Sequence, residues 1–210
     1  MPIVASSNVP NFSPELMRLL ARAKLINQHY EKDFDISFSS MLLAFLVSDD
    51  AISRWFSDYV KTAGIDAGRI IDERKVSHKI LQDIASRTIL PNLLPLSYRQ
   101  TTSTTMYLAI ADKYRESLAG SNIMSPLQVH HLMAVYIYEP WVHKQDLIRW
   151  GFDRMDWSNA FLIQMSKLYP MEFDFWKRQH HKTFLIYPDF SGNSLSSNGY
   201  KDNSATLQVI

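Results

Sequence analysis

Three short motifs recur in the same order in the two halves of the chain. Each pair is separated by between 87 and 90 positions: "LARA" at Leu20 and "LAIA" at Leu108, "SMLLAFL" at Ser40 and "HHLMAVY" at His130, and the glycines of "AGID" and "WGFD" at Gly64 and Gly151. Self-similarity at a nearly fixed offset is the sequence signature of a repeat architecture. We therefore expect two copies of one small helical unit, each burying its apolar stripe against the other.

Apolar residues recur at helical spacing through both halves. The first stripe is Leu16, Leu19, Leu20, Ala23 and Ile26. It follows Ser13, a good N-cap, and Pro14, which suits the first helical position. Ser125 and Pro126 predict the same kind of helix start in the second half. Because no convincing run of alternating apolar and polar residues predicts a strand, the expected fold class is all-α, a tandem repeat of two short-helix bundles.

Turn-forming residues divide the chain into expected regions. "LPNLLPLS" at 90–97 has two prolines and predicts a connector between the halves. The expected regions are an irregular N-terminal arm at 1–11, a first helical repeat plus connecting helix at 12–90, a second helical repeat with an extra C-terminal helix at 98–184, and a Ser/Asn/Gly-rich linker or tail at 185–210. The tail composition predicts a tether to a further domain.

Composition excludes several classes of site. A net charge of +1 gives no general electrostatic reason to bind nucleic acid or acidic lipid. The chain has no cysteine, which removes disulfides, thiol nucleophiles and Cys-based metal sites. It begins without a signal-peptide pattern, and its apolar runs are shorter than the roughly 20 residues that cross a bilayer. We expect a cytoplasmic protein with neither nucleic-acid nor membrane partner.

The ordered motifs resemble a known family. The succession of "FS", "LLARA", "ISFSSMLLAFL" and "GID" is similar to the N-terminal domain of the Clp (Hsp100) unfoldases, and the resemblance covers roughly residues 12–168. It implies a tandem repeat of short helices and a role in protein unfolding or turnover. In the family a largely structural His commonly begins the second helix of each repeat. His130 falls on that position, Ser40 replaces it in the first repeat, and His131 then occupies a usually apolar position.

Two departures limit what the resemblance implies. Some family members carry a Glu just before that His in both repeats and use the pair to bind phosphoarginine. Ser39 and Val129 stand there in this chain, so that activity is not carried over. The ATPase modules are also missing, since no G-x-x-x-x-G-K-[ST] motif is present.

The histidines raise the question of a metal site. His130 and His131 are sequence neighbours, which point about 100° apart on a helix and do not form the one-face i, i+4 pair of zinc enzymes. His143 follows a helix break at Pro140, and there is no H-E-x-x-H or G-x-S-x-G motif. Capping, packing and surface roles are favoured over zinc ligation. We expect no metal, no cofactor and no catalytic residue, and hence no enzyme activity of this chain alone.

Aromatic residues concentrate in the second half. Tyr138, Trp141, Trp150 and Phe152 are the candidate binding residues, because Trp and Tyr are enriched at interfaces. Core packing of an elaborated second half is the alternative. Under the binding interpretation, Ala at Trp141 or Trp150 weakens partner capture without unfolding the domain; unfolding of both variants would instead place the two tryptophans in the core.

The expected function is therefore protein recognition, by docking a peptide, adaptor or client protein in a groove between helices. A regulatory or targeting domain of a downstream enzyme is a second hypothesis. A metal-dependent hydrolase is a third, for which stoichiometric zinc would be required.

Overall fold

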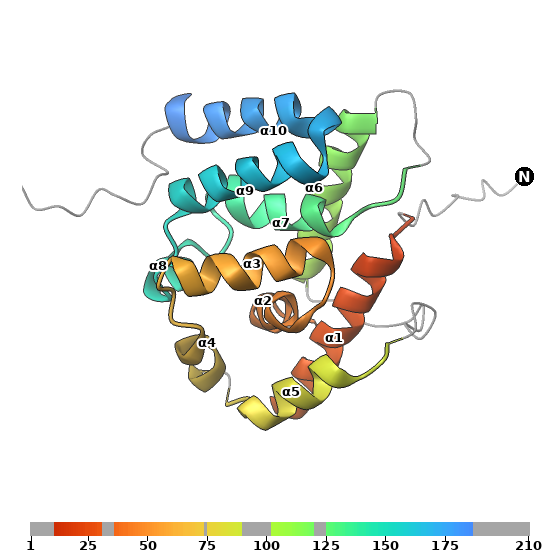
Figure 1. Cartoon of the computed structure of the whole chain (residues 1–210), viewed down its shortest axis with the longest axis vertical. Coiled ribbons are helices and arrows are strands. Elements are labelled where there is room, and N and C mark those ends of the chain that lie inside the picture. Colours follow the sequence, from red (N-terminus) through yellow and green to blue (C-terminus); the bar gives the residue numbers. More distant parts are fainter. Residues whose placement is uncertain (1–10, 31–35, 74, 90–101, 120–124, 187–210) are drawn as a thin grey trace, which may run out of the picture.

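The computed structural model describes residues 11–30, 36–73, 75–89, 102–119 and 125–186. Within these ranges the backbone forms helices and no strand, which confirms the all-α fold class for that part of the chain (Figure 1). Most of the expected arm, the connector at 90–97 and most of the expected tail lie outside the described residues.

The helices divide between the two halves of the chain. In the first half they are α1 (Pro14–Tyr30), α2 (Phe38–Val47), α3 (Ala51–Thr62), α4 (Ala67–Glu73) and α5 (His78–Ser86). In the second half they are α6 (Thr102–Ala119), α7 (Val129–Tyr138), α8 (Lys144–Arg149), α9 (Arg154–Leu168), the 3-10 turn η2 (Pro170–Glu172), α10 (Phe173–His180) and the π-helical turn η3 (His181–Ile186).

Polar side chains cap the first turns of three helices, including the predicted cap at Ser13. The Ser13 hydroxyl accepts the Leu16 N–H at the start of α1, 3.2 Å away. Asp50 and Asp153 do the same for α3 and α9, where each carboxylate accepts two backbone N–H groups of the first turn. Each cap satisfies N–H groups that have no partner within the helix.

The start of α7 differs from the prediction. The pattern at Ser125 and Pro126 predicts a helix from Pro126, but α7 begins at Val129. The reason is a tertiary contact: the Leu127 N–H donates to the Asn11 carbonyl at 2.6 Å, and the Ser13 N–H donates to the Leu127 carbonyl at 2.8 Å. This parallel bridge between Phe12 and Leu127 uses the backbone groups that a helix would otherwise take.

Gly64 and Gly151 form turns with the same hydrogen bonds. Their φ angles are +67° and +88°, in the left-handed region that favours glycine. The N–H of the next residue reaches back to the helix in both places, from Ile65 to the Val60 carbonyl at 3.1 Å and from Phe152 to the Leu147 carbonyl at 2.9 Å. These hydrogen bonds form a Schellman motif, in which each glycine is the C′ residue of the helix it ends.

Both halves contribute to one continuous hydrophobic core. Phe56 of α3 stacks on Phe152 with ring centroids 6.1 Å apart and lies 5.4 Å from Trp157 of α9. Figure 1 shows α3, α9 and α10 stacked side by side, and α3 contacts both α7 and α9. The two halves of the chain are therefore packed against each other through α3, α7 and α9.

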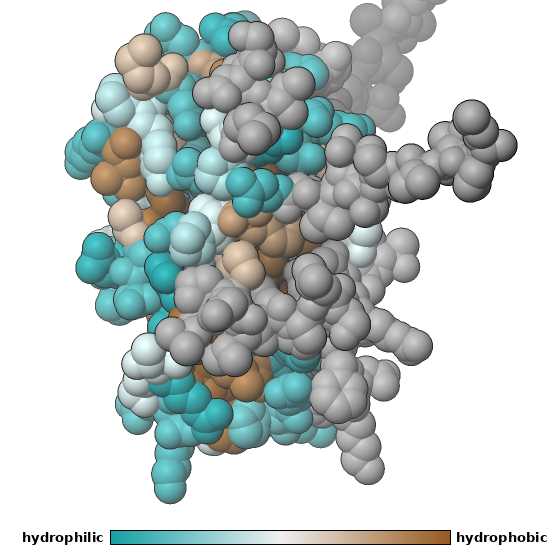
Figure 2. All heavy atoms as spheres, turned by 90° about the vertical axis from the view of Figure 1, so that its right-hand side faces the viewer, coloured by the Kyte–Doolittle hydropathy of each residue, from teal (hydrophilic) through white to brown (hydrophobic). Residues whose placement is uncertain are grey.

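The described surface is mixed in character. Figure 2 shows a face that is largely hydrophilic where it is described, with separate hydrophobic areas between the polar side chains. In the part of the chain that the structure describes, no helix has both the length and the apolar character needed to cross a membrane.

Candidate functional site

Trp141 stands out on the surface of the second half. It lies in the turn between α7 and α8, and 48% of its surface is exposed. Among the described residues it is the one aromatic side chain with such exposure. Covering an exposed indole with a partner's apolar surface is favourable, because it removes that surface from water. This position is therefore the first candidate for partner contact.

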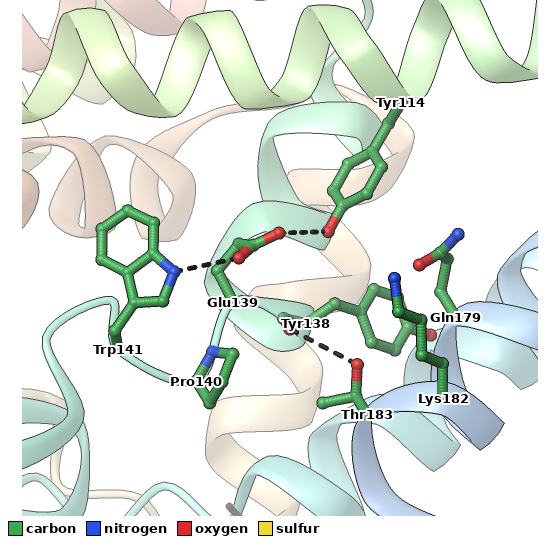
Figure 3. Close-up of a pocket in the computed structure, with 8 residues that line it drawn as sticks. All are labelled: Tyr114, Tyr138, Glu139, Pro140, Trp141, Gln179, Lys182 and Thr183. Carbon is green, nitrogen blue, oxygen red and sulfur yellow. Dashed lines mark hydrogen bonds between the residues drawn. The ribbon is translucent and has the colours of Figure 1, made fainter. Parts of the chain in front are cut away.

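A carboxylate fixes the orientation of this indole. Glu139, the C-cap of α7, accepts a hydrogen bond from Trp141 Nε1 at 3.0 Å and another from the Tyr114 hydroxyl at 2.8 Å. Burial raises the pKa of Tyr114, and the neighbouring Glu139 charge raises it further, so the phenol stays protonated and donates. Figure 3 shows Glu139 between the two rings, with both hydrogen bonds drawn.

Two hollows flank Trp141. The first, which we call the Tyr114 hollow, measures about 260 Å³ and is lined by Tyr114, Tyr138, Glu139, Pro140, Trp141, Gln179, Lys182 and Thr183. Gln179 and Lys182 extend into it from α10 and η3, opposite Glu139 (Figure 3). The second, the Met106 hollow, measures about 590 Å³ and is lined by Met106, Tyr107, Trp141, His143, Lys144, Gln145 and Asp146. Trp141 lines both hollows and separates them.

The turn that carries Trp141 ends in a backbone outlier. His143 has φ +42° and ψ +40°, an uncommon conformation for a residue other than glycine. Its ring stacks on Phe38 of α2, with centroids 3.9 Å apart and planes within 3°, and its Nδ1 lies 3.0 Å from Asp146 Oδ2. Such backbone conformations persist where the surrounding structure holds them, and they are frequent at functional sites.

Arg154 supports the same turn from inside. Its side chain is 6% exposed, and its guanidinium donates from Nη1 to the Glu139 carbonyl at 2.5 Å and from Nη2 to the Val142 carbonyl. Burial lowers the pKa of Arg154 to about 10, while the Glu139 charge acts in the opposite direction. The guanidinium is therefore still charged at neutral pH.

The other predicted binding residues lie inside the protein. Tyr138, Trp150 and Phe152 are only 3%, 1% and 5% exposed. Trp150 stacks on Phe38, and Phe152 stacks on Phe56. Tyr138 lines the Tyr114 hollow but is otherwise packed against Trp176. Of the four candidates, the structure leaves only Trp141 largely accessible.

Sequence reasoning missed Tyr114, Glu139 and Arg154. No motif marks them, since Tyr114 and Arg154 are far from Trp141 in sequence and come together with it only in the fold. The one local signal was "EPW", in which Pro140 ends the helix and places Glu139 and Trp141 on either side of a turn.

The neighbouring histidines lie in a buried polar cluster. Their rings are 4.0 Å apart, closer than their directions on an ideal helix predict. His130 Nε2 lies 2.8 Å from Glu172 Oε2, which also accepts a hydrogen bond from Trp176 Nε1. One possible ligand atom from each of His130, His131 and Glu172 falls within 4.8 Å of the others, so among the described residues this trio is a candidate metal site.

The hydrogen bonding of His131 argues against that chemistry. Its Nδ1 accepts the Gln128 backbone N–H at 3.0 Å, so in the neutral ring the proton is on Nε2 and no lone pair remains for a metal. Burial lowers the pKa of His131 to about 2, with the neighbouring His130 and Arg115 acting in the same direction. As bonded here, the cluster is a structural network that holds η2 and α10 against α7.

The bond from Gln128 to His131 has a counterpart at the start of α2. Ser40 Oγ accepts the backbone N–H of Ser37, the N-cap of α2, at 3.0 Å. Both Ser40 and His131 stand at the third position of their helix. By helix position and hydrogen bond, Ser40 thus corresponds to His131, one position after the His130 that the motif pairs with it.

His180 pairs with Ser158, which is not accessible to solvent. The Ser158 hydroxyl lies 2.8 Å from His180 Nδ1, yet Ser158 is completely buried in α9. Burial also lowers the pKa of His180. A nucleophile must reach substrate, so this pair has the composition of a catalytic dyad without its accessibility.

Comparisons with protein-family models, curated proteins and solved structures find no match to this chain.

Proposed function

We propose that the chain is a cytoplasmic protein-recognition domain that docks a peptide, adaptor or client protein at the surface around Trp141. We further propose that it is a tandem repeat similar to the N-terminal domain of the Clp unfoldases. The link to protein unfolding or turnover rests on that resemblance, and the location on the absence of cysteine.

Three pairs of equivalent contacts support the repeat. The Gly64 and Gly151 turns share their hydrogen bonds, and Ser40 and His131 make the same bond at the third position of α2 and α7. The residues just before the two N-caps also contact the beginning of the opposite half. The Leu127 carbonyl accepts the Ser13 N–H, while the Ile36 carbonyl accepts the Thr104 hydroxyl at 2.6 Å. This reciprocity is expected of two repeats related by an approximate two-fold axis.

The observation that carries the docking proposal is the exposed, oriented indole of Trp141 between two hollows. Interface energy concentrates in a few aromatic residues, with Trp the most enriched, and rigid side chains lose little entropy on binding. The hydrogen bond from Trp141 to Glu139 supplies that rigidity. The hollows on both sides give a partner's side chains space next to the indole.

The test selects peptides from a random display library on the immobilised full chain. Affinities of the selected peptides are then measured by fluorescence anisotropy for the wild type and for Trp141→Ala. We expect the substitution to weaken binding at least about tenfold, the equivalent of about 1.4 kcal/mol.

Ile163→Ala is the matched control. Ile163 is 59% exposed on α9 and lines neither hollow, so its removal deletes a similar apolar surface elsewhere. Peptides that bind Trp141→Ala as well as the wild type would refute the proposal, as would a library that yields no saturable binder.

A further inference from the structure

The turn from Glu139 to Val142 is held at both ends by one side chain. Arg154, the first residue of α9, donates to the Glu139 carbonyl and to the Val142 carbonyl, which lie on either side of Trp141. The Glu139 carbonyl also accepts the Val142 N–H at 3.0 Å, which closes the turn on itself. The conformation of the Trp141 backbone therefore depends on groups that converge on these two carbonyls.

We infer that Arg154 is the positioning residue of the docking surface, and that it presents Trp141 to the partner through the turn it holds. The inference rests on the proposed function for its role in recognition. The chain of contacts is continuous: Arg154 fixes the backbone of Glu139, and the Glu139 side chain fixes the Trp141 indole. Tyr114 fixes the other oxygen of the same carboxylate.

The geometry requires a guanidinium. Arginine is planar and offers donors in a rigid fork, so one side chain can serve two carbonyl oxygens that face it. A lysine ammonium is a single point of charge on a flexible stem and does not reproduce the fork. A buried carbonyl left without a donor also costs free energy, which disfavours the present turn once Arg154 is replaced.

The test follows the indole itself and needs no partner. The chain is labelled with 5-fluorotryptophan, which gives one 19F NMR resonance for each of the five tryptophans. The resonance of Trp141 is assigned by its loss in Trp141→Phe. In Arg154→Lys we expect this resonance to move toward its position in the urea-unfolded chain, while the resonances of Trp55 and Trp176 stay in place.

Arg22→Lys is the control. Arg22 is also a buried arginine, 4% exposed, but it pairs with Asp49 at 2.9 Å in the first half. We expect it to leave the Trp141 resonance unchanged. Tyr114→Phe, which removes one hydroxyl and leaves Arg154 intact, should move the Trp141 resonance less than Arg154→Lys does.

Two results would overturn the inference. The first is a folded Arg154→Lys variant whose Trp141 resonance matches the wild type. The second is global unfolding of both Arg154→Lys and Arg154→Gln, which would make Arg154 a general core residue. The spectrum is recorded without peptide, so a moved resonance supports the positioning role even if peptide selection fails. Failure of the positioning inference is therefore distinguishable from failure of the docking proposal.

Discussion

The imidazole of His131 closes the first turn of α7 on the backbone of Gln128, through a 3.0 Å hydrogen bond to Nδ1. The ring can accept this bond only when Nδ1 carries no proton, so the cap requires neutral His131. In the first half the Ser40 hydroxyl performs the same task on Ser37 with a group that does not titrate in the physiological range. The start of α7 is therefore sensitive to pH, and the start of α2 is not.

Acid should destabilise the domain through His131. Burial lowers the folded-state pKa to about 2, whereas the ordinary value is 6.5. Below pH 6.5 the unfolded chain binds a proton that the folded chain does not, so stability is present above that pH and is lost as pH falls. We expect a loss of up to about 1.4 kcal/mol per pH unit below 6.5, or about 2 kcal/mol at pH 5. Urea unfolding at a series of pH values measures it.

His131→Gln separates this effect from other titrations. A glutamine at the third helical position can still accept the N-cap N–H, but it does not titrate. We expect a flatter dependence of stability on pH between 6.5 and 5. His78→Gln, at an exposed position at the start of α5, should keep the wild-type dependence. An equally steep loss in His131→Gln and in the wild type would remove His131 as the cause.

Features set by neighbouring residues could be predicted from the sequence. Ser13, Asp50 and Asp153 cap helices because each acts on N–H groups two or three positions away. The start of α7 was not predictable in this way. Ser125 and Pro126 form a good local helix start, but the pairing of Leu127 with Asn11 and Ser13 outweighs it. The capping role of His131 was not predictable either, because two adjacent histidines fit the same motif and only the bond to Gln128 distinguishes them.

In the candidate site too, some features follow from the sequence and others depend on contacts between distant segments. Composition identified the second-half aromatics, and Trp141 is the exposed one. Which aromatics are buried depends on partners from the first half, such as Phe38 against Trp150 and Phe56 against Phe152. Periodicity within one helix carries no information about such contacts between segments that are distant in sequence.

Trp141 and Trp150 should therefore respond differently to the same substitution. Trp150→Ala removes a side chain that is 1% exposed and leaves a cavity, which we expect to cost about 3–5 kcal/mol of folding free energy. Trp141→Ala removes a half-exposed side chain and should cost about 1 kcal/mol or less. Urea unfolding followed by circular dichroism gives both values. Equal losses in the two variants would contradict the burial of Trp150 and the accessibility of Trp141.

Gly64 and Gly151 provide a test of the equivalence of the two halves. At both positions a Cβ atom would meet no other atom within 4 Å, so alanine adds no clash. The cost of substitution comes from φ values of +67° and +88°, which disfavour an L-residue by roughly 1–2 kcal/mol. We expect Gly64→Ala and Gly151→Ala to destabilise the domain by similar amounts in urea unfolding, and Gln82→Ala, on the exposed side of α5, to have little effect.

The double variant tests whether the two halves unfold together. Because both halves share one core, its free energy of unfolding should fall by the sum of the two single losses, and it should still unfold in a single cooperative transition. A marked loss at only one glycine would show that the two turns do not play equivalent roles, and two separate transitions would contradict the shared core.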